Sequence, residues 1–229
     1  MKKSRIASLI VLLVLIPLTL FLGTRLTGRA YYLTSTLVVM EILIPFFLAF
    51  EGRRPQAREL VVIAVMAAIA IVSRVVVPIP SFKPIFAVIM LTGIAFGPET
   101  GFLVGAVSAL GSNFFFGQGP YTPWQMMAYG TGGLLAGFVF SKGWVEKKPL
   151  SMAFFGFFAV VLVVGPLLDT CTIFLTLSRF TLRSVLTIFG SGAIINLTQA
   201  ACTALTMLLF GKTLLEKLER VQTKYGMLE

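Results

Sequence analysis

Long apolar runs separated by short polar or basic joins make up nearly the whole chain. A helix takes about 20 apolar residues to cross a bilayer, so each run predicts a membrane-spanning helix or most of one. The segments that we predict are 6–23, 31–50, 59–77, 84–97, 100–116, 124–141, 151–175 and 186–210. This pattern predicts an all-α polytopic membrane protein.

Two dipeptides predict departures from straight spans. Gly97-Pro98 separates the short fourth segment from the fifth and favours a tight helical hairpin. Gly165-Pro166 lies within the long seventh segment, where it predicts a kink or last turns that leave the hydrocarbon.

Composition supports the membrane class. Apolar residues make up 57% of the 229 positions, charged residues make up only 12%, and the mean hydropathy is +0.95. Soluble domains carry about a quarter charged residues, so an ordinary globular enzyme and a disordered chain are both excluded. The chain has no His, and Cys171 and Cys202 lie in apolar runs without a CxxC pair. We therefore expect no catalytic residues, no metal site and no bound cofactor.

The basic residues predict the topology. The joins at 2–5, 53–58, 142–148 and 212–224 carry about twice as many Lys and Arg as those at 25–29, 74–83 and 179–183. We therefore expect a multi-pass plasma-membrane protein with both termini in the cytoplasm. A cleaved signal peptide is the alternative for the first segment, but no A-x-A-like site follows it.

The polar join at 51–58 divides the chain by composition. Two segments with few small residues precede it, and six segments rich in Gly and Ala follow it. We expect two N-terminal transmembrane helices over 1–52, a six-helix core over 53–213 and a cytoplasmic tail over 214–229.

Small residues recur at a spacing of four, which lets helix backbones approach closely in lipid. We interpret the repeated glycines (Gly93, Gly97, Gly101, Gly105, Gly133 and Gly137) as internal packing of the bundle. Ala64 and Ala68 share one face of the third segment. That face either packs inside the bundle or docks against another membrane protein, and the sequence leaves both alternatives open.

The predicted outer loop between the fifth and sixth segments is the candidate binding site. It combines aromatic rings, side-chain amides and rigid Pro/Gly turns, a mixture that suits a flat organic ligand. The alternative is an interfacial aromatic belt, which does not need amides so close together. The candidate residues of this loop are Asn113, Gln118, Tyr121, Trp124 and Gln125.

Charged residues in or near the predicted outer loops are second-rank candidates for ligand binding. Arg74, Lys83 and Arg179 lie in or beside the outer loops. Asp169 lies within an apolar segment at a depth that these cations reach, so it predicts either an ion pair or a ligand contact. Glu41 lies near the middle of the second segment, and we expect it to pair with a core residue. The sequence shows no nucleotide-binding loop, so any transport is expected to be driven by a partner.

From about residue 50 onward the chain resembles the substrate-binding S components of energy-coupling-factor (ECF) transporters. The elements that carry the resemblance are the stretches 50–59 and 64–68, the glycine-rich stretch 93–105, the loop 116–125 and the tail 218–226. The loop Gly-Gln-Gly-Pro-Tyr-Thr-Pro-Trp-Gln, which ends at Gln125, looks most like the branch associated with cobalamin uptake.

This resemblance implies a substrate-capture subunit. The family's six-helix core binds a vitamin at its outer face and docks on a transmembrane coupling subunit that bears two ATPase subunits. ATP hydrolysis would thus reside on the partners, and Ala64 and Ala68 would form the docking face. Cobalamin or a related corrinoid is the expected ligand, with folate or riboflavin as alternatives. A membrane-embedded enzyme acting on lipid is the alternative of a different class; the outer basic residues support it, and the lack of His and of a close carboxylate pair opposes it.

Overall fold

The computed structural model describes residues 57–177 and 180–225, together with a few single positions between 15 and 44. The regular structure of the two long ranges is entirely helical, which confirms the predicted all-α class. The elements are α4 (Ala57–Val76), α5 (Ile85–Phe96), α6 (Pro98–Phe116), α7 (Thr122–Ser141), α8 (Pro149–Ala159), the π-helical η2 (Val160–Val164), α9 (Gly165–Thr176) and α10 (Leu182–Tyr225).

The predicted hairpin between the fourth and fifth segments is present. Gly97 takes φ 96°, and its N–H donates to the Gly93 carbonyl at 2.9 Å while its own carbonyl accepts from Gly101 at 3.0 Å. Pro98 occupies the first turn of α6, where its missing N–H costs no helical hydrogen bond. The chain therefore ends α5 and begins α6 within two residues.

The seventh segment is one helical run of 28 residues, Pro149–Thr176, long and apolar enough to cross a membrane. Its irregularity is a π-helical turn at Val160–Val164, directly before Gly165 and Pro166. A proline ring clashes with the carbonyl of the preceding turn, and a wider π turn relieves that clash.

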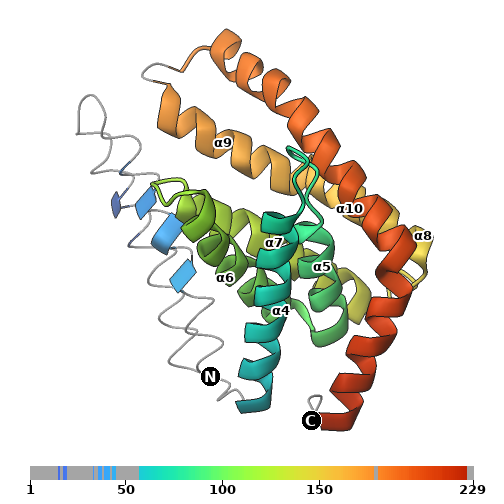
Figure 1. Cartoon of the computed structure of the whole chain (residues 1–229). Helices are drawn as coiled ribbons and strands as arrows, with labels where there is room; N and C mark the ends of the chain where they lie inside the picture. The colour runs from blue at the N-terminus through green and yellow to red at the C-terminus, as the bar shows by residue number, and fades with distance from the viewer. Residues whose placement is uncertain are drawn as a thin grey trace.

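The last helix is much longer than predicted. α10 has 44 residues, which corresponds to about 66 Å of helix, roughly twice the thickness of the hydrocarbon core. It continues without a break to Tyr225, within the segment 214–229 that was expected as a tail. Lys147 donates to Glu219 at 2.6 Å and thereby ties the α7–α8 join to this part of α10. Figure 1 shows α10 running along the whole length of the molecule.

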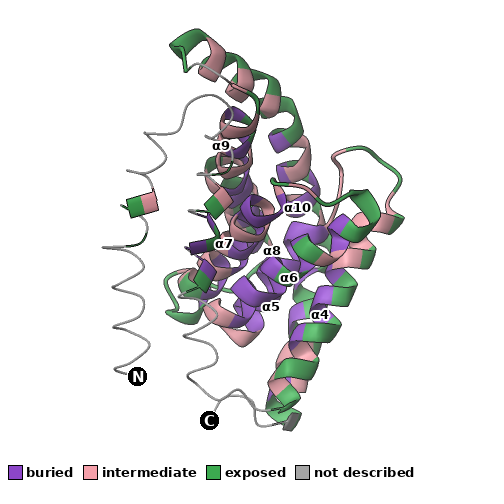
Figure 2. Cartoon of the chain, turned by 90° about the vertical axis from the view of Figure 1, so that its left-hand side faces the viewer, coloured by how far each residue is buried: buried purple, intermediate pink, exposed green. Residues whose placement is uncertain are grey.

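Helix α5 is the centre of the core, and its residues Ile85–Ala95 are all buried. Figure 2 shows this buried helix among α6, α7 and α10. A Cβ added to Gly93 would lie 2.2 Å from the Gly133 carbonyl oxygen, and one added to Gly101 would lie 2.6 Å from the same atom. Only glycine allows the three backbones to approach so closely, which confirms the predicted packing role of Gly93, Gly101 and Gly133. The prediction is wrong for Gly97, where an added Cβ would meet nothing within 4 Å and the glycine instead supplies the positive φ of the turn.

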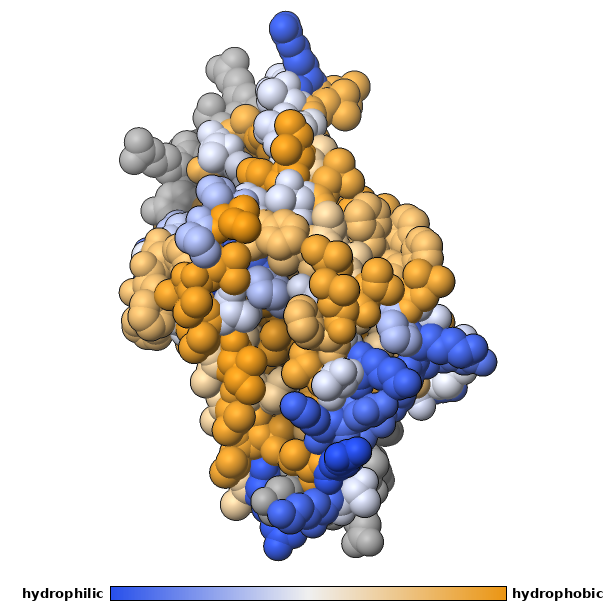
Figure 3. All heavy atoms as spheres, turned by 45° about the vertical axis from the view of Figure 1, so that its right-hand side comes forward, coloured by the Kyte–Doolittle hydropathy of each residue, from blue (hydrophilic) through white to orange (hydrophobic). Residues whose placement is uncertain are grey.

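The surface suits a bilayer. Many large apolar side chains are exposed, among them Val65, Val72 and Leu209. Figure 3 shows apolar residues over most of this face and hydrophilic residues gathered towards the lower end, where α4 begins and α10 ends. We call this end the basic end, and we call the opposite end, with the joins 77–84 and 117–121, the outer end.

The close contact of Gly93, Gly101 and Gly133 predicts that a single added methyl group lowers the stability of the protein. Gly133→Ala should lower the free energy of unfolding by about 1–3 kcal/mol, because the new Cβ would meet the Gly101 carbonyl oxygen at 2.2 Å. The measurement is thermal unfolding of the purified protein in detergent. The matched control is Gly190→Ala, where an added Cβ meets nothing within 4 Å. Equal melting temperatures for the two variants would contradict this account.

Candidate functional site

Arg74 anchors the candidate site at the outer end of α4. Its Nη1 donates to Ser112 Oγ at 2.5 Å and to Asn113 Oδ1 at 3.1 Å. The guanidinium also lies over the Phe116 ring at 4.8 Å and the Tyr129 ring at 5.6 Å from the centroids. Hydrogen bonds and cation–π contacts together hold this half-buried cation against the ends of α6 and α7.

Asn113 links the ends of α6 and α7. Its side chain is 1% exposed, and its Nδ2 donates to Gln125 Oε1 at 2.8 Å and to Thr122 Oγ1 at 3.1 Å. With Arg74 bound to Oδ1, both N–H groups and the oxygen of this amide have partners. Asn113 therefore positions its neighbours.

The loop between α6 and α7 is also internally bonded. Gln118 Nε2 donates to the Leu110 carbonyl at 3.0 Å, and Gln118 Oε1 accepts from Thr122 Oγ1 at 2.9 Å. Tyr121 donates its hydroxyl to the Gly117 carbonyl at 2.8 Å. The structure thus brings the predicted amide residues together, and they hydrogen-bond chiefly to one another and to the backbone. The loop is preorganised by these bonds.

Trp124 lies deeper than the sequence suggested. Its side chain is 7% exposed and stacks on Phe174 of α9, with ring centroids 5.8 Å apart. Val39 and Leu43, from the second predicted N-terminal segment, belong to the same apolar cluster. The buried Trp124 Nε1 finds no acceptor within the described part of the chain. An indole N–H usually finds a partner when it is buried, so Trp124 is an exception among the described residues.

The predicted ion pairs of Asp169 with Arg74 and Lys83 are not formed. Arg74 binds Ser112 and Asn113, and Lys83 donates to the Val77 carbonyl within its own loop. Each cation reaches acceptors close to its own helix end, while Asp169 of α9 lies against Asn196 and Gly192 of α10. Arg179 lies outside the described residues.

Asp169 instead joins α9 to α10. Asn196 Nδ2 donates to Asp169 Oδ2 at 2.8 Å, and both side chains are buried. A Cβ at Gly192 would lie 2.2 Å from Asp169 Oδ1, so the glycine makes room for the carboxylate. A hydrogen bond between two buried polar groups offsets part of their desolvation cost in an apolar setting.

Glu41 also has a different partner from the one predicted. Thr19 donates its hydroxyl to Glu41 Oε1 at 2.6 Å, so this bond joins the two predicted N-terminal segments and does not reach the core. Thr36 donates to the Pro120 carbonyl at 3.2 Å and places the second of these segments beside the α6–α7 loop.

Several site residues escaped the sequence analysis. Ser112 and Thr122 are small hydroxyl residues without a periodic signal, and Phe174 looked like one apolar residue among many. Asn196 carried a usable signal, because an amide within an apolar span is costly and needs a partner. The same rule that singled out Asp169 identifies it.

The predicted docking residues are on the surface. Ala64 and Ala68 are exposed, whereas Ala67 and Ala70 of the same helix are buried. Ala64 and Ala68 thus lie outside the buried core of the described residues, and their docking role stays a prediction.

The described structure is that of an all-helical membrane protein whose outer loop is held by hydrogen bonds among amides, hydroxyls and one arginine. A family model described as "ECF-type riboflavin transporter, S component" matches residues 55–216. The chain therefore belongs to this family of ECF S components, and it is a transporter subunit that binds substrate, not an enzyme. No curated protein and no solved structure matches the chain significantly. The match supports the S-component resemblance, and the cobalamin branch stays a prediction.

Thr122 offers a test of the preorganised loop. Thr122→Val keeps the shape of the side chain and removes bonds to Asn113, Gln118 and the Gly119 N–H. We expect a loss of stability of about 1–3 kcal/mol, because buried partners lose their hydrogen bonds. Thermal unfolding measures this loss. The control Thr187→Val removes one bond from an exposed hydroxyl to its own helix, and a loss as large there would contradict the proposed role of the loop.

Proposed function

We propose that the chain captures a vitamin at its outer end and delivers it inward after docking on a coupling subunit that carries two ATPase subunits. The observation that carries this proposal is the buried indole N–H of Trp124, which lacks an acceptor in the described structure beside a preorganised loop. A ligand with a hydrogen-bond acceptor and a flat apolar surface would accept from the Trp124 N–H and pack against the aromatic residues of the loop. The family match supplies the transport context.

Two vitamins are favoured by specific observations. Riboflavin is named in the description of the matching family model, and its flat ring with carbonyl and nitrogen acceptors suits an indole donor and an arginine. A corrinoid is favoured by the resemblance of the loop at 117–125. The amides around a corrin ring would suit the loop amides, but Asn113 and Gln118 already have partners, so this argument carries less weight.

Calorimetric titration with riboflavin, cobalamin and folate tests the ligand. Trp124→Ala should weaken binding by about 1–3 kcal/mol, the range of an anchoring aromatic residue. Trp124→Phe retains an aromatic ring against Phe174 and loses the donor with part of the ring area, so we expect a smaller loss of about 0.5–1.5 kcal/mol. The control is Trp144→Phe, an exposed residue of the α7–α8 join. Unchanged affinity in both Trp124 variants would remove this residue from the site, and tight binding of folate alone would discard both favoured vitamins.

We also propose that Ala64 and Ala68 form the docking face. Ala68→Phe should abolish uptake by cells that coexpress the coupling and ATPase subunits, because a large ring prevents close helix approach. Vitamin binding by the isolated subunit should persist, since the side chain points away from the core.

The matched control for docking is Ile194→Phe, an exposed apolar position on α10. Copurification of the coupling subunit and vitamin uptake are measured together. Loss of binding in step with uptake would show that Ala68 supports the fold, and normal uptake by Ala68→Phe would place the docking face elsewhere.

A further inference from the structure

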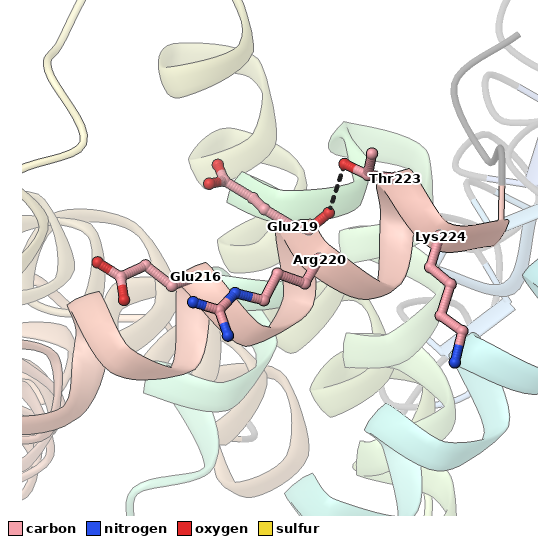
Figure 4. Close-up of a pocket in the computed structure, with 5 residues that line it drawn as sticks. All are labelled: Glu216, Glu219, Arg220, Thr223 and Lys224. Atoms are coloured by element: carbon pink, nitrogen blue, oxygen red, sulfur yellow. Dashed lines mark hydrogen bonds between the residues drawn. The ribbon is translucent and has the colours of Figure 1, made fainter.

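The second predicted N-terminal segment packs against the core near the outer end. At the basic end the surface is hollowed, as the charged recess on the last turns of α10 shows (Figure 4). Around Trp124 the space is filled instead, because Val39 is 1% exposed and Leu43 is 6% exposed in the cluster that contains the indole. Both positions lie outside residues 55–216, which the family model matches.

One side of this segment meets the core. Thr36, Val39 and Leu43 are helical and follow one another at a spacing of three and four residues, so they share one side of a helix. Val39 and Leu43 pack in the cluster, and Thr36 donates to the Pro120 carbonyl at 3.2 Å. The exposed apolar positions of the segment lie on another side: Leu33, Leu37, Met40 and Ile44. Burial thus follows the helical period, as expected for a helix seated on the core.

The core side of the cluster comes from three helices. Its buried members are Phe102 and Ala106 of α6, Trp124 of α7 and Cys171 of α9. Val39 and Leu43 complete the cluster from outside the six-helix core. In a bilayer, acyl chains would take the place of these two side chains if the segment were absent.

We propose that the N-terminal addition forms a wall of the vitamin site, where it shields Trp124 from lipid and holds the indole against Phe174. This inference rests on the proposed function, in which Trp124 anchors the vitamin. An anchor that is already held in its bound position loses less conformational freedom when the ligand arrives, so it binds more tightly. Val39 and Leu43 are therefore positioning residues that act through Trp124.

Fluorescence of Trp124 tests the wall without any vitamin. The chain has two tryptophans, so Trp144→Phe leaves Trp124 as the only one. The full chain is reconstituted in vesicles of phosphatidylcholine with brominated acyl chains, which quench an indole that they touch. We expect weak quenching in the Trp144→Phe protein. Adding Leu43→Ala should roughly double it, because the truncation leaves a cavity beside the indole.

Vitamin affinity tests whether the wall serves the site. Riboflavin, cobalamin and folate are titrated calorimetrically into the full chain. Leu43→Ala should weaken binding roughly fivefold, within the range of coupling between residues in contact. In the Trp124→Ala background Leu43→Ala should have no further effect, because the wall acts through the indole. The matched control is Leu37→Ala, the same truncation at an exposed position of the segment, which should match the wild type in both measurements.

Four results would overturn the inference. Strong lipid quenching of Trp124 in the Trp144→Phe protein would show that the segment does not shield it, and this measurement leaves the wall itself unchanged. Equal vitamin affinity in wild type and Leu43→Ala would overturn the inference alone and leave the proposed function intact. An equal loss of affinity from Leu43→Ala with and without Trp124 would show that Leu43 only supports the fold. A chain that binds none of the three vitamins would overturn the proposed function together with this inference.

Discussion

The close approach of α5, α6 and α7 is the constraint on which the rest of the molecule depends. Gly133 of α7 lies against both Gly93 and Gly101, so three helix backbones meet without intervening side chains. In lipid, such contacts replace the hydrophobic drive that water supplies to soluble proteins. Because α6 and α7 run antiparallel at this short distance, the end of α6 and the start of α7 are held together. Asn113 and Gln125 bond across that gap.

Helix α4 contributes to three different parts of the surface. Its outer end supplies Arg74 to the loop network, its middle exposes Ala64 and Ala68, and its first turns line an apolar groove together with Phe96 and Val221.

The sequence predicted the features that depend on local chemistry. Apolar run length located the core helices, Gly97-Pro98 located the hairpin, and the spacing of glycines located the contact between helices. It did not predict the features that depend on three-dimensional partners. The amides of Asn113 and Gln125 were expected to face a ligand, but they bond to each other, because buried amides take the nearest partner. Asp169 was expected to pair with a cation at a similar depth in the membrane, but its partner is Asn196 of α10.

The hydrogen bonds already present within the outer loop determine which interactions can contribute to ligand affinity. A site whose polar groups are already paired gains little from new hydrogen bonds, since each must replace an existing one. It gains instead from burial of apolar area and from low ordering cost, because the loop does not rearrange. Trp124 Nε1 is the exception, since it lacks a partner in the described structure. A hydrogen bond from Nε1 to a ligand would therefore break no existing hydrogen bond. Affinity should then depend on ring area and on one acceptor, and the surrounding amides should determine orientation.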